Sequence, residues 1–185
     1  MSKDELRAAA LAARAGVEEP GLRASHACAH LRGWLGRHAP HAPLAGYFPI
    51  RGELDPRPVL AAHAGPTALP VVPGFRQPLL FRAWRMGQPV VPGPFGTFQP
   101  PESAESLQPE VVIVPLAGYD RRGARVGYGG GFYDRTLEFL RARGPVVAVG
   151  LGFAAQEVAL VPEEPFDQPL DLIATEAGIL LPQRG

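Results

Sequence analysis

Residues 125–135, with the sequence RVGYGGGFYDR, combine a cluster of glycines with an aspartate at the start of a predicted helix. Four of the five residues from 127 to 131 are glycine, which allows backbone N–H groups to converge on a ligand and approach it closely. The N-terminus of the following helix adds the positive end of its dipole. The segment therefore predicts a site for phosphate.

The loop differs from two well-known phosphate motifs. A Walker loop ends in Gly-Lys-Ser/Thr, whereas this loop continues with Phe132, Tyr133 and Asp134. A dinucleotide fingerprint needs its third glycine at position 132. That position is Phe132, so this motif is excluded as well. Asp134 has two interpretations: it interacts with the positive end of the helix dipole, or it binds Mg²⁺ beside a polyphosphate.

Basic residues near the N-terminus form a second group that could bind an anion. Among the 18 basic residues only Lys3 is lysine, which indicates that this position is kept for chemistry that arginine cannot copy. The alternative is that a lysine stands there by chance. Lys3, Arg7 and Arg14 lie on one stripe of a predicted helix, which is either a solvated face or a site for an anion.

The composition limits the classes of protein. Formal net charge is zero, so no overall field favours nucleic acid or an acidic membrane. Cys28 is the single cysteine, which excludes an internal disulfide and suits a reducing compartment. No apolar run reaches the roughly 18 residues of a membrane helix, and the N-terminus lacks a signal-peptide core. We expect a cytoplasmic protein.

The elements that position these residues begin with a helix over residues 2–16. Ser2 and Glu5 form a capping box, Gly16 is a usual C-terminal signal, and Leu6 and Ala10 recur at helical spacing on the apolar face. Further helices are predicted near residues 22–38, 56–63, 133–143 and 154–160.

Short apolar runs separated by glycine and proline predict strands at 44–48, 69–72, 78–84, 111–116, 146–151 and 170–175. Several are apolar on consecutive positions, as expected for strands that are covered on both faces. We predict one α/β domain over residues 1–185, with a mostly parallel sheet flanked by helices. Residues 86–110 hold six prolines and are predicted as either a lid or binding loop, or a surface connector.

The stretch PLAGYDRRGARVGYGGGFYDR, residues 115–135, closely resembles the signature of the 5-formyltetrahydrofolate cyclo-ligase family. The similarity extends in order along nearly the whole chain, through KDELR (3–7), GYFPIRGELD (46–55), LLFRAW (79–84), FGTFQP (95–100) and FDQPLDLIATE (166–176). The long signature is specific, whereas each of the shorter matches is weak by itself.

The resemblance implies an ATP-dependent ligase. Members of the family convert 5-formyltetrahydrofolate and MgATP to 5,10-methenyltetrahydrofolate, ADP and phosphate. The formyl oxygen takes the γ-phosphoryl group, nitrogen 10 of the folate attacks the activated carbon, and phosphate leaves. The expected small molecules are therefore 5-formyltetrahydrofolate, ATP and Mg²⁺. We expect neither nucleic acid nor a membrane as a partner. We expect the protein to be a monomer.

The resemblance also assigns roles to residues of this chain. It implies that ATP is bound by Lys3, Arg7, Arg125, Gly127, Tyr128, Gly129, Gly130, Gly131, Phe132 and Tyr133. It places Mg²⁺ on Asp134 and Asp171. It implies that the folate contacts Phe48, Glu53 and Tyr133, and that Lys3, Arg125 and Tyr133 take part in catalysis.

Some positions depart from the family pattern. Gln99 stands where many members have glutamate, Tyr128 and Gly130 stand where several have basic residues, and Phe166 replaces a common histidine. Two alternatives remain open: a non-catalytic relative that binds folate or nucleotide, and an enzyme of similar architecture acting on another phosphorylated small molecule. The presence of both the ATP-side and the folate-side segments favours the cyclo-ligase.

Overall fold

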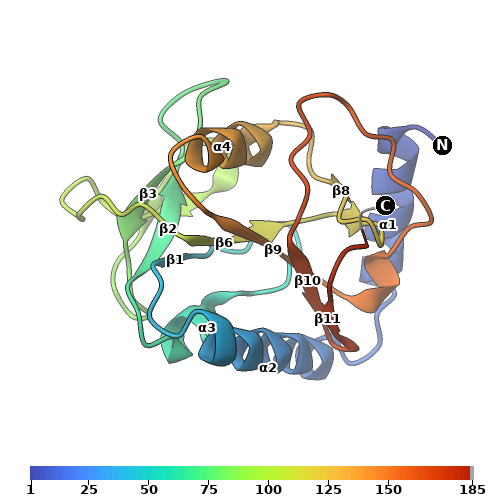
Figure 1. Cartoon of the computed structure of the whole chain (residues 1–185), viewed down its shortest axis with the longest axis horizontal. Coiled ribbons are helices and arrows are strands. Elements are labelled where there is room, and N and C mark those ends of the chain that lie inside the picture. Colours follow the sequence, from blue (N-terminus) through green and yellow to red (C-terminus); the bar gives the residue numbers. More distant parts are fainter. Residues whose placement is uncertain (184–185) are drawn as a thin grey trace.

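A seven-stranded sheet forms the centre of the computed structural model, which describes residues 1–183 (Figure 1). Its order is β11-β10-β9-β6-β1-β2-β3. The strands from β10 to β2 are parallel to their neighbours, whereas β11 and β3 pair antiparallel at the two edges. The bounds are β1 Leu44–Ala45, β2 Thr67–Val71, β3 Leu80–Ala83, β6 Val111–Pro115, β9 Val147–Leu151, β10 Leu172–Thr175 and β11 Gly178–Leu180.

The predicted α/β fold with a mostly parallel sheet is confirmed. Residues 184–185 of the predicted domain lie outside the described residues. Strand β6 shows why the central strands are apolar on consecutive positions: Val111 and Ile113 belong to the hydrophobic cluster on one face, and Val112 and Val114 belong to the cluster on the other. Successive side chains of a strand point to opposite faces, so both sets must be apolar.

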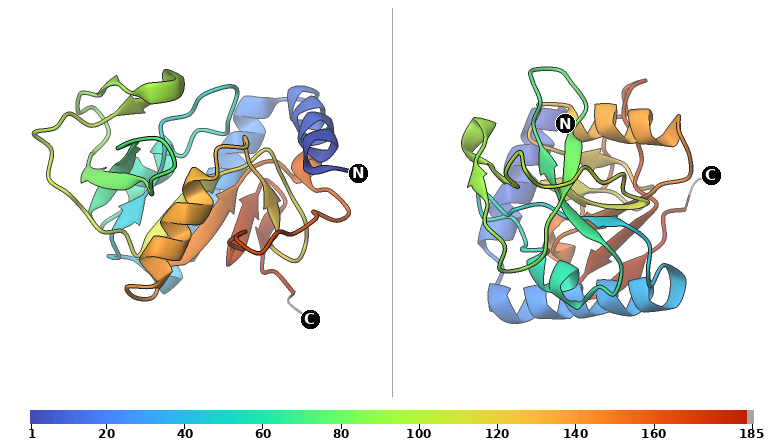
Figure 2. Two further views of the ribbon diagram at one scale, coloured as in Figure 1. Left: turned by 90° about the horizontal axis from the view of Figure 1, so that it is seen from above. Right: turned by 90° about the vertical axis from the view of Figure 1, so that its left-hand side faces the viewer.

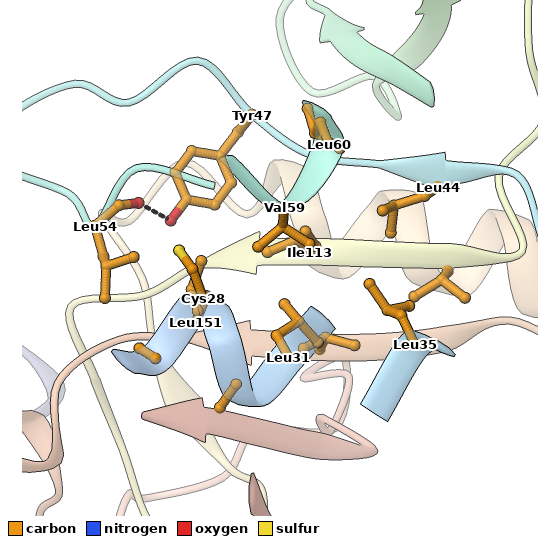
Figure 3. Packing of buried hydrophobic residues seen from close by; sticks show 14 of the residues in the cluster. Cys28, Leu31, Leu35, Leu44, Tyr47, Leu54, Val59, Leu60, Ile113 and Leu151 are labelled. Carbon is orange, nitrogen blue, oxygen red and sulfur yellow. Dashed lines mark hydrogen bonds between the residues drawn. The ribbon is translucent and has the colours of Figure 1, made fainter. Parts of the chain in front are cut away.

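Helices cover both faces of the sheet (Figure 1). Helices α2 (Pro20–His38) and α3 (Arg57–Ala62) cover one face, and α4 (Phe132–Arg141) covers the other. Leu31 of α2 and Val59 of α3 point toward Ile113 (Figure 3). Cys28 lies in the same cluster, and burial raises the pKa of its thiol to about 11, which suits a packing role rather than a nucleophile.

Helix α1 (Lys3–Ala15) stands apart from the other helices at one side of the molecule (Figures 1 and 2). The predicted capping box of Ser2 and Glu5 is present, and Gly16 is the C-cap of the helix. Leu6 packs in a small cluster with Val126 and Val161. Val126 belongs to β8 (Arg125–Val126), which pairs with β7 (Gly118–Tyr119) in a hairpin. The helix is therefore anchored beside the strand that leads into the glycine loop.

Other segments differ from the prediction. The helix predicted for 154–160 is wrong beyond a short turn, η2 (Ala154–Gln156), because Val158 donates its N–H to the carbonyl of Tyr119 at 2.8 Å and so extends along β7. Segment 86–110 contains a two-stranded hairpin of β4 (Val91–Pro92) and β5 (Phe98–Gln99), joined through η1 (Pro94–Gly96). Among residues 1–183, no helix has both the length and the apolar composition that a membrane crossing requires.

Candidate active site

A cavity of about 640 Å³ opens where several parallel strands end. Tyr47 and Phe48 follow β1, Val72 follows β2, and Pro115 ends β6; all four residues line the cavity. Binding sites of open parallel sheets lie at these carboxyl ends. The remaining walls come from the first turn of α1, the hairpin β4–β5, the glycine loop and residues 164–167.

The first turn of α1 brings cations to the cavity. The Nζ of Lys3 lies 2.6 Å from Oε2 of Glu164 and 2.6 Å from Oδ2 of Asp167. Partial burial disfavours the ammonium, but the hydrogen bonds to Asp167 and Glu164 outweigh it, so the pKa of Lys3 is raised. Arg7 donates from Nε to the carbonyl of Gly127 at 2.6 Å. The ammonium is thus held charged, and Arg7 fixes the start of the glycine loop.

The glycine loop needs glycine for its backbone conformation. Gly129 has φ +92° and Gly131 has φ +64°, values that side-chain-bearing residues rarely adopt. Gly131 is the N-cap of α4, so the loop leads directly into the positive end of that helix. All residues from Gly127 to Tyr133 line the cavity, and together they form the loop wall.

A buried ion pair lies behind the loop. Nη2 of Arg125 is 2.7 Å from Oδ1 of Asp134, and the side chain of Arg125 is 7% exposed. The N–H of Gln168 also donates to Oδ1 of Asp134, at 3.0 Å. Nε of Arg125 has no hydrogen-bond partner among the described residues. A buried N–H without a partner is costly, and the same guanidinium lines the cavity.

Another wall of the cavity carries Glu53 among aromatic side chains. The Oε2 of Glu53 accepts the N–H of Ile50 at 2.9 Å. Burial raises the pKa of Glu53, and Ile50, Arg14 and Arg51 act against that shift. Phe48 packs against Phe98, with ring centroids 5.1 Å apart. This wall combines aromatic surface with one acceptor for N–H groups.

Tyr133 belongs to both parts of the cavity. Its ring is on the first turn of α4, next to the glycine loop, and it lines the cavity. Burial raises the pKa of its hydroxyl far above the usual range, and the charge of Glu53 adds to that shift. Tyr133 therefore stays neutral and can donate a hydrogen bond.

Every residue assigned from the sequence lines this cavity except Asp171. Asp171 directly precedes β10, so it lies at the amino end of a parallel strand, whereas the cavity lies at carboxyl ends. Its Oδ2 accepts from the N–H of Ala148 at 2.8 Å and from Nη2 of Arg141 at 2.9 Å. The structure does not bring Asp171 together with Asp134 at the cavity.

Sequence reasoning missed Asp167 and Glu164, which line the cavity and hold Lys3. The segment FDQPLD offers two aspartates four residues apart, and its spacing alone does not decide which of them faces the site. Among residues 1–183, no group of three or more His, Cys, Asp or Glu side chains is arranged to hold a metal. Mg²⁺ bound to nucleotides needs only one or two protein carboxylates beside the phosphates, a requirement that Asp134 and Asp167 fit.

Comparisons with known proteins show the family of the chain. The model of the 5-formyltetrahydrofolate cyclo-ligase family matches residues 1–176. The 5-formyltetrahydrofolate cyclo-ligase of Mycolicibacterium smegmatis is 36% identical, in an alignment covering 100% of this chain and 95% of the relative. The enzyme of the same name from Haemophilus influenzae is 31% identical over 135 residues, which cover 69% of this chain and 72% of the relative.

Two solved structures resemble the fold. The 5,10-methenyltetrahydrofolate synthetase of Aquifex aeolicus has a TM-score of 0.76 and 26% identity, covering 100% of this chain and 95% of that one. The synthetase of Mycoplasma pneumoniae has a TM-score of 0.73 and 21% identity, covering 95% of this chain and 99% of that one. At that identity the second comparison shows the fold alone.

Proposed function

Because the chain belongs to the 5-formyltetrahydrofolate cyclo-ligase family and is thus a ligase, we propose that it converts 5-formyltetrahydrofolate and MgATP to 5,10-methenyltetrahydrofolate, ADP and phosphate. One observation carries the proposal. A single cavity has two kinds of wall, one of cations with the glycine loop and one of aromatic side chains with Glu53. The first wall suits a polyphosphate, and the second suits a flat ring with N–H donors.

The nucleotide would bind at the glycine loop. Lys3 and Arg7 of α1 would contact its phosphates, together with backbone N–H groups of residues 127–131. Lys3 pairs with two carboxylates, and phosphate oxygens would replace these partners. The bond from Arg7 to the carbonyl of Gly127 keeps the loop next to the helix that supplies the cations.

Asp134 and Asp167 would hold the Mg²⁺ of MgATP. We prefer Asp167 to Asp171 because Asp167 lines the cavity and Asp171 does not. Both proposed carboxylates are now paired with cations, Asp134 with Arg125 and Asp167 with Lys3. Phosphates that pair with Arg125 and Lys3 would leave the two carboxylates available to bind Mg²⁺. Bound there, Mg²⁺ would neutralise charge on the phosphate oxygens.

The folate would bind on the other wall. Its ring N–H groups would donate to Glu53, and Phe48 would cover one side of the ring. Tyr133 lies between the two walls, so it would contact both substrates.

The proposed reaction has two steps. The formyl oxygen attacks the γ-phosphorus, and the bond from that phosphorus to ADP breaks. Nitrogen 10 then attacks the formyl carbon and loses its proton, the carbon–oxygen bond breaks, and phosphate leaves with the former formyl oxygen and takes up that proton. The protein contributes position and charge. The guanidinium of Arg125, which lines the cavity, would offset negative charge on the transferred group.

The direct test is incubation with 5-formyltetrahydrofolate and MgATP, followed by the near-ultraviolet absorbance of the methenyl product and by ADP formation. We expect one ADP for each methenyltetrahydrofolate, and no product when ATP or Mg²⁺ is omitted. Binding of either ligand without product would show a non-catalytic relative. Absence of both binding and product would favour an enzyme for another phosphorylated molecule.

A further inference from the structure

Arg14 connects two walls of the cavity from outside it. This residue of α1 does not line the cavity. Its Nη1 donates to the hydroxyl of Tyr128 at 2.8 Å, and its Nη2 donates to the carbonyl of Arg51. Tyr128 belongs to the glycine loop, whereas Arg51 belongs to the turn of residues 50–53, which includes Glu53. One guanidinium therefore joins segments that lie 114 and 37 residues from it in the chain.

The turn at 50–53 has an unusual backbone that Arg14 helps to hold. Arg51 has φ +53° and Gly52 has φ +73°, and such values are costly for a residue other than glycine. The turn closes on Glu53, whose Oε2 accepts the N–H of Ile50 at 2.9 Å. The bond from Arg14 to the carbonyl of Arg51 therefore fixes the strained residue just before the proposed folate carboxylate.

A second contact joins the same two segments. The guanidinium carbon of Arg51 lies 5.8 Å from the centroid of the Tyr128 ring, within the range of a cation–π interaction. Arg14 and Arg51 also act against the rise that burial causes in the pKa of Glu53. Arg14, Tyr128 and Arg51 thus form a bridge between the glycine loop at one end and the turn that carries Glu53 at the other.

Arg14 is not required to hold α1 in place. The helix is anchored through Leu6 and Ala10, which are buried, and its N-terminus is closed by the Ser2 capping box. The hydrophobic clusters of the described residues do not include Arg14. Its removal should therefore leave the fold intact and affect the bridge.

We propose that Arg14 is a positioning residue that couples the two substrate sites, so that nucleotide at the glycine loop raises the affinity for folate at Glu53. The inference rests on the proposed function, because it assigns the two walls to two substrates. A ligand that orders Tyr128 would also order Arg14 and the turn, and the second ligand would then lose less conformational freedom on binding. By linkage, folate raises the affinity for nucleotide by the same factor.

The test is calorimetric titration of the magnesium complex of β,γ-imido-ATP, with and without saturating 5-formyltetrahydrofolate. The ratio of the two dissociation constants measures the coupling. For the wild type we expect at least about a 5-fold ratio, the lower end for coupled sites. Arg14→Met should bring the ratio close to 1. Tyr128→Phe keeps the ring and removes only the hydroxyl acceptor, so it should lower the ratio as well, and Arg14→Lys should retain part of it.

Arg23→Met is the matched control. Arg23 lies on α2 and binds the carbonyl of Glu18 at 2.9 Å and the carboxylate of Glu176 at 3.4 Å, away from the cavity. This variant should keep the wild-type ratio and melt at the same temperature as Arg14→Met. A wild-type ratio of 1, or an unchanged ratio in Arg14→Met and Tyr128→Phe, would overturn the coupling while leaving the enzyme activity in place. A wild type that makes no methenyl product would overturn both proposals.

Discussion

Lys3 is already bound by carboxylates where we propose phosphate oxygens. Glu164 and Asp167 each lie 2.6 Å from its Nζ, and Asp167 has a further proposed role at the metal. Glu164 has none, so it only competes with phosphate for the ammonium. Its side chain is 51% exposed, which limits the effect of its charge through solvent screening.

Glu164→Gln should therefore lower the KM for MgATP by roughly 2- to 5-fold, the range for an exposed ion pair of about 0.4–1 kcal/mol. Glu163→Gln is the matched control, because Glu163 pairs with Arg122 at 2.7 Å and does not line the cavity. Steady-state kinetics at fixed ionic strength measure both variants. A higher KM in Glu164→Gln, or the same change in both variants, would mean that Glu164 does not compete with the nucleotide.

Asp134 and Asp167, the proposed Mg²⁺ ligands, should behave differently from Asp171. Asp134→Asn and Asp167→Asn should lower kcat strongly and raise the Mg²⁺ concentration needed for half-maximal rate, because amides are poorer ligands for hard cations. Asp171→Asn should leave the Mg²⁺ dependence unchanged. It weakens the pair with Arg141 and should lower the melting temperature by about 2–4 °C, the shift for about 1 kcal/mol in a chain of this length. A Mg²⁺ dependence altered only in Asp171→Asn would reverse the assignment.

Glu53 predicts a pH dependence of folate binding. Burial raises its pKa above the usual 4.5, so protonation begins at a higher pH than for an exposed glutamate. Burial favours the neutral, protonated form of Glu53 over its carboxylate. The stability of the ligand-free protein should therefore fall as the pH rises through the window between 4.5 and the raised pKa. Folate affinity should change in the opposite sense, because the carboxylate is the better acceptor.

The measurement is the dissociation constant of 5-formyltetrahydrofolate across that window, for wild type and Glu53→Gln. The ratio of the two constants removes the titration of the ligand itself. We expect the advantage of the wild type to disappear as the pH falls. A ratio that does not vary with pH would show that the charge of Glu53 is not used in folate binding.

At the scale of elements, the glycine loop is the feature whose backbone matters most. Gly129 has φ +92°, and an added Cβ would lie 3.8 Å from Nη2 of Arg7, inside the cavity wall. Gly87 has the same φ of +92° but lies outside the cavity, with no atom within 4 Å of an added Cβ. The two positions therefore share the same left-handed φ and differ in their relation to the proposed nucleotide site.

Gly129→Val and Gly87→Val should both melt earlier than the wild type, through strain of roughly 1–3 kcal/mol. Only Gly129→Val should lose the stabilisation that MgATP gives, because the added methyl groups fill the space of the phosphates. Thermal unfolding with and without MgATP separates the effects. Stabilisation of Gly129→Val equal to that of Gly87→Val would remove the loop from the nucleotide site.

The sequence predicts elements well where the cause is local. Ser2, Glu5 and Gly16 fix the ends of α1 through hydrogen bonds within a few residues, and those bonds are present. The consecutive apolar residues of β6 and β9 follow from burial on both faces. The helix predicted for 154–160 fails because its backbone pairs with Tyr119, more than thirty residues away. The helix propensity of residues 154–160 gives no information about a partner that is so distant in the sequence.

At the scale of the whole molecule, the site is assembled from segments distant in the chain. The folate-side turn follows the carboxyl end of β1, and the glycine loop lies beyond that of β6. The basic start of α1 joins this site through the bond from Arg7 to Gly127, and the segment of Asp167 joins it through the pair with Lys3. The sequence, with the family resemblance, predicted most of these residues. It did not predict that Asp167 faces the cavity while Asp171 faces away, since that difference depends on where β10 begins.

The central claim is that the formyl oxygen receives the γ-phosphoryl group. It can be tested by supplying 5-formyltetrahydrofolate with ¹⁸O in its formyl group, together with MgATP in unlabelled water, and by measuring the mass of the released phosphate. We predict one ¹⁸O atom in each phosphate, in proportion to the methenyltetrahydrofolate formed. Phosphate without ¹⁸O, released while the methenyl product accumulates, would contradict the account.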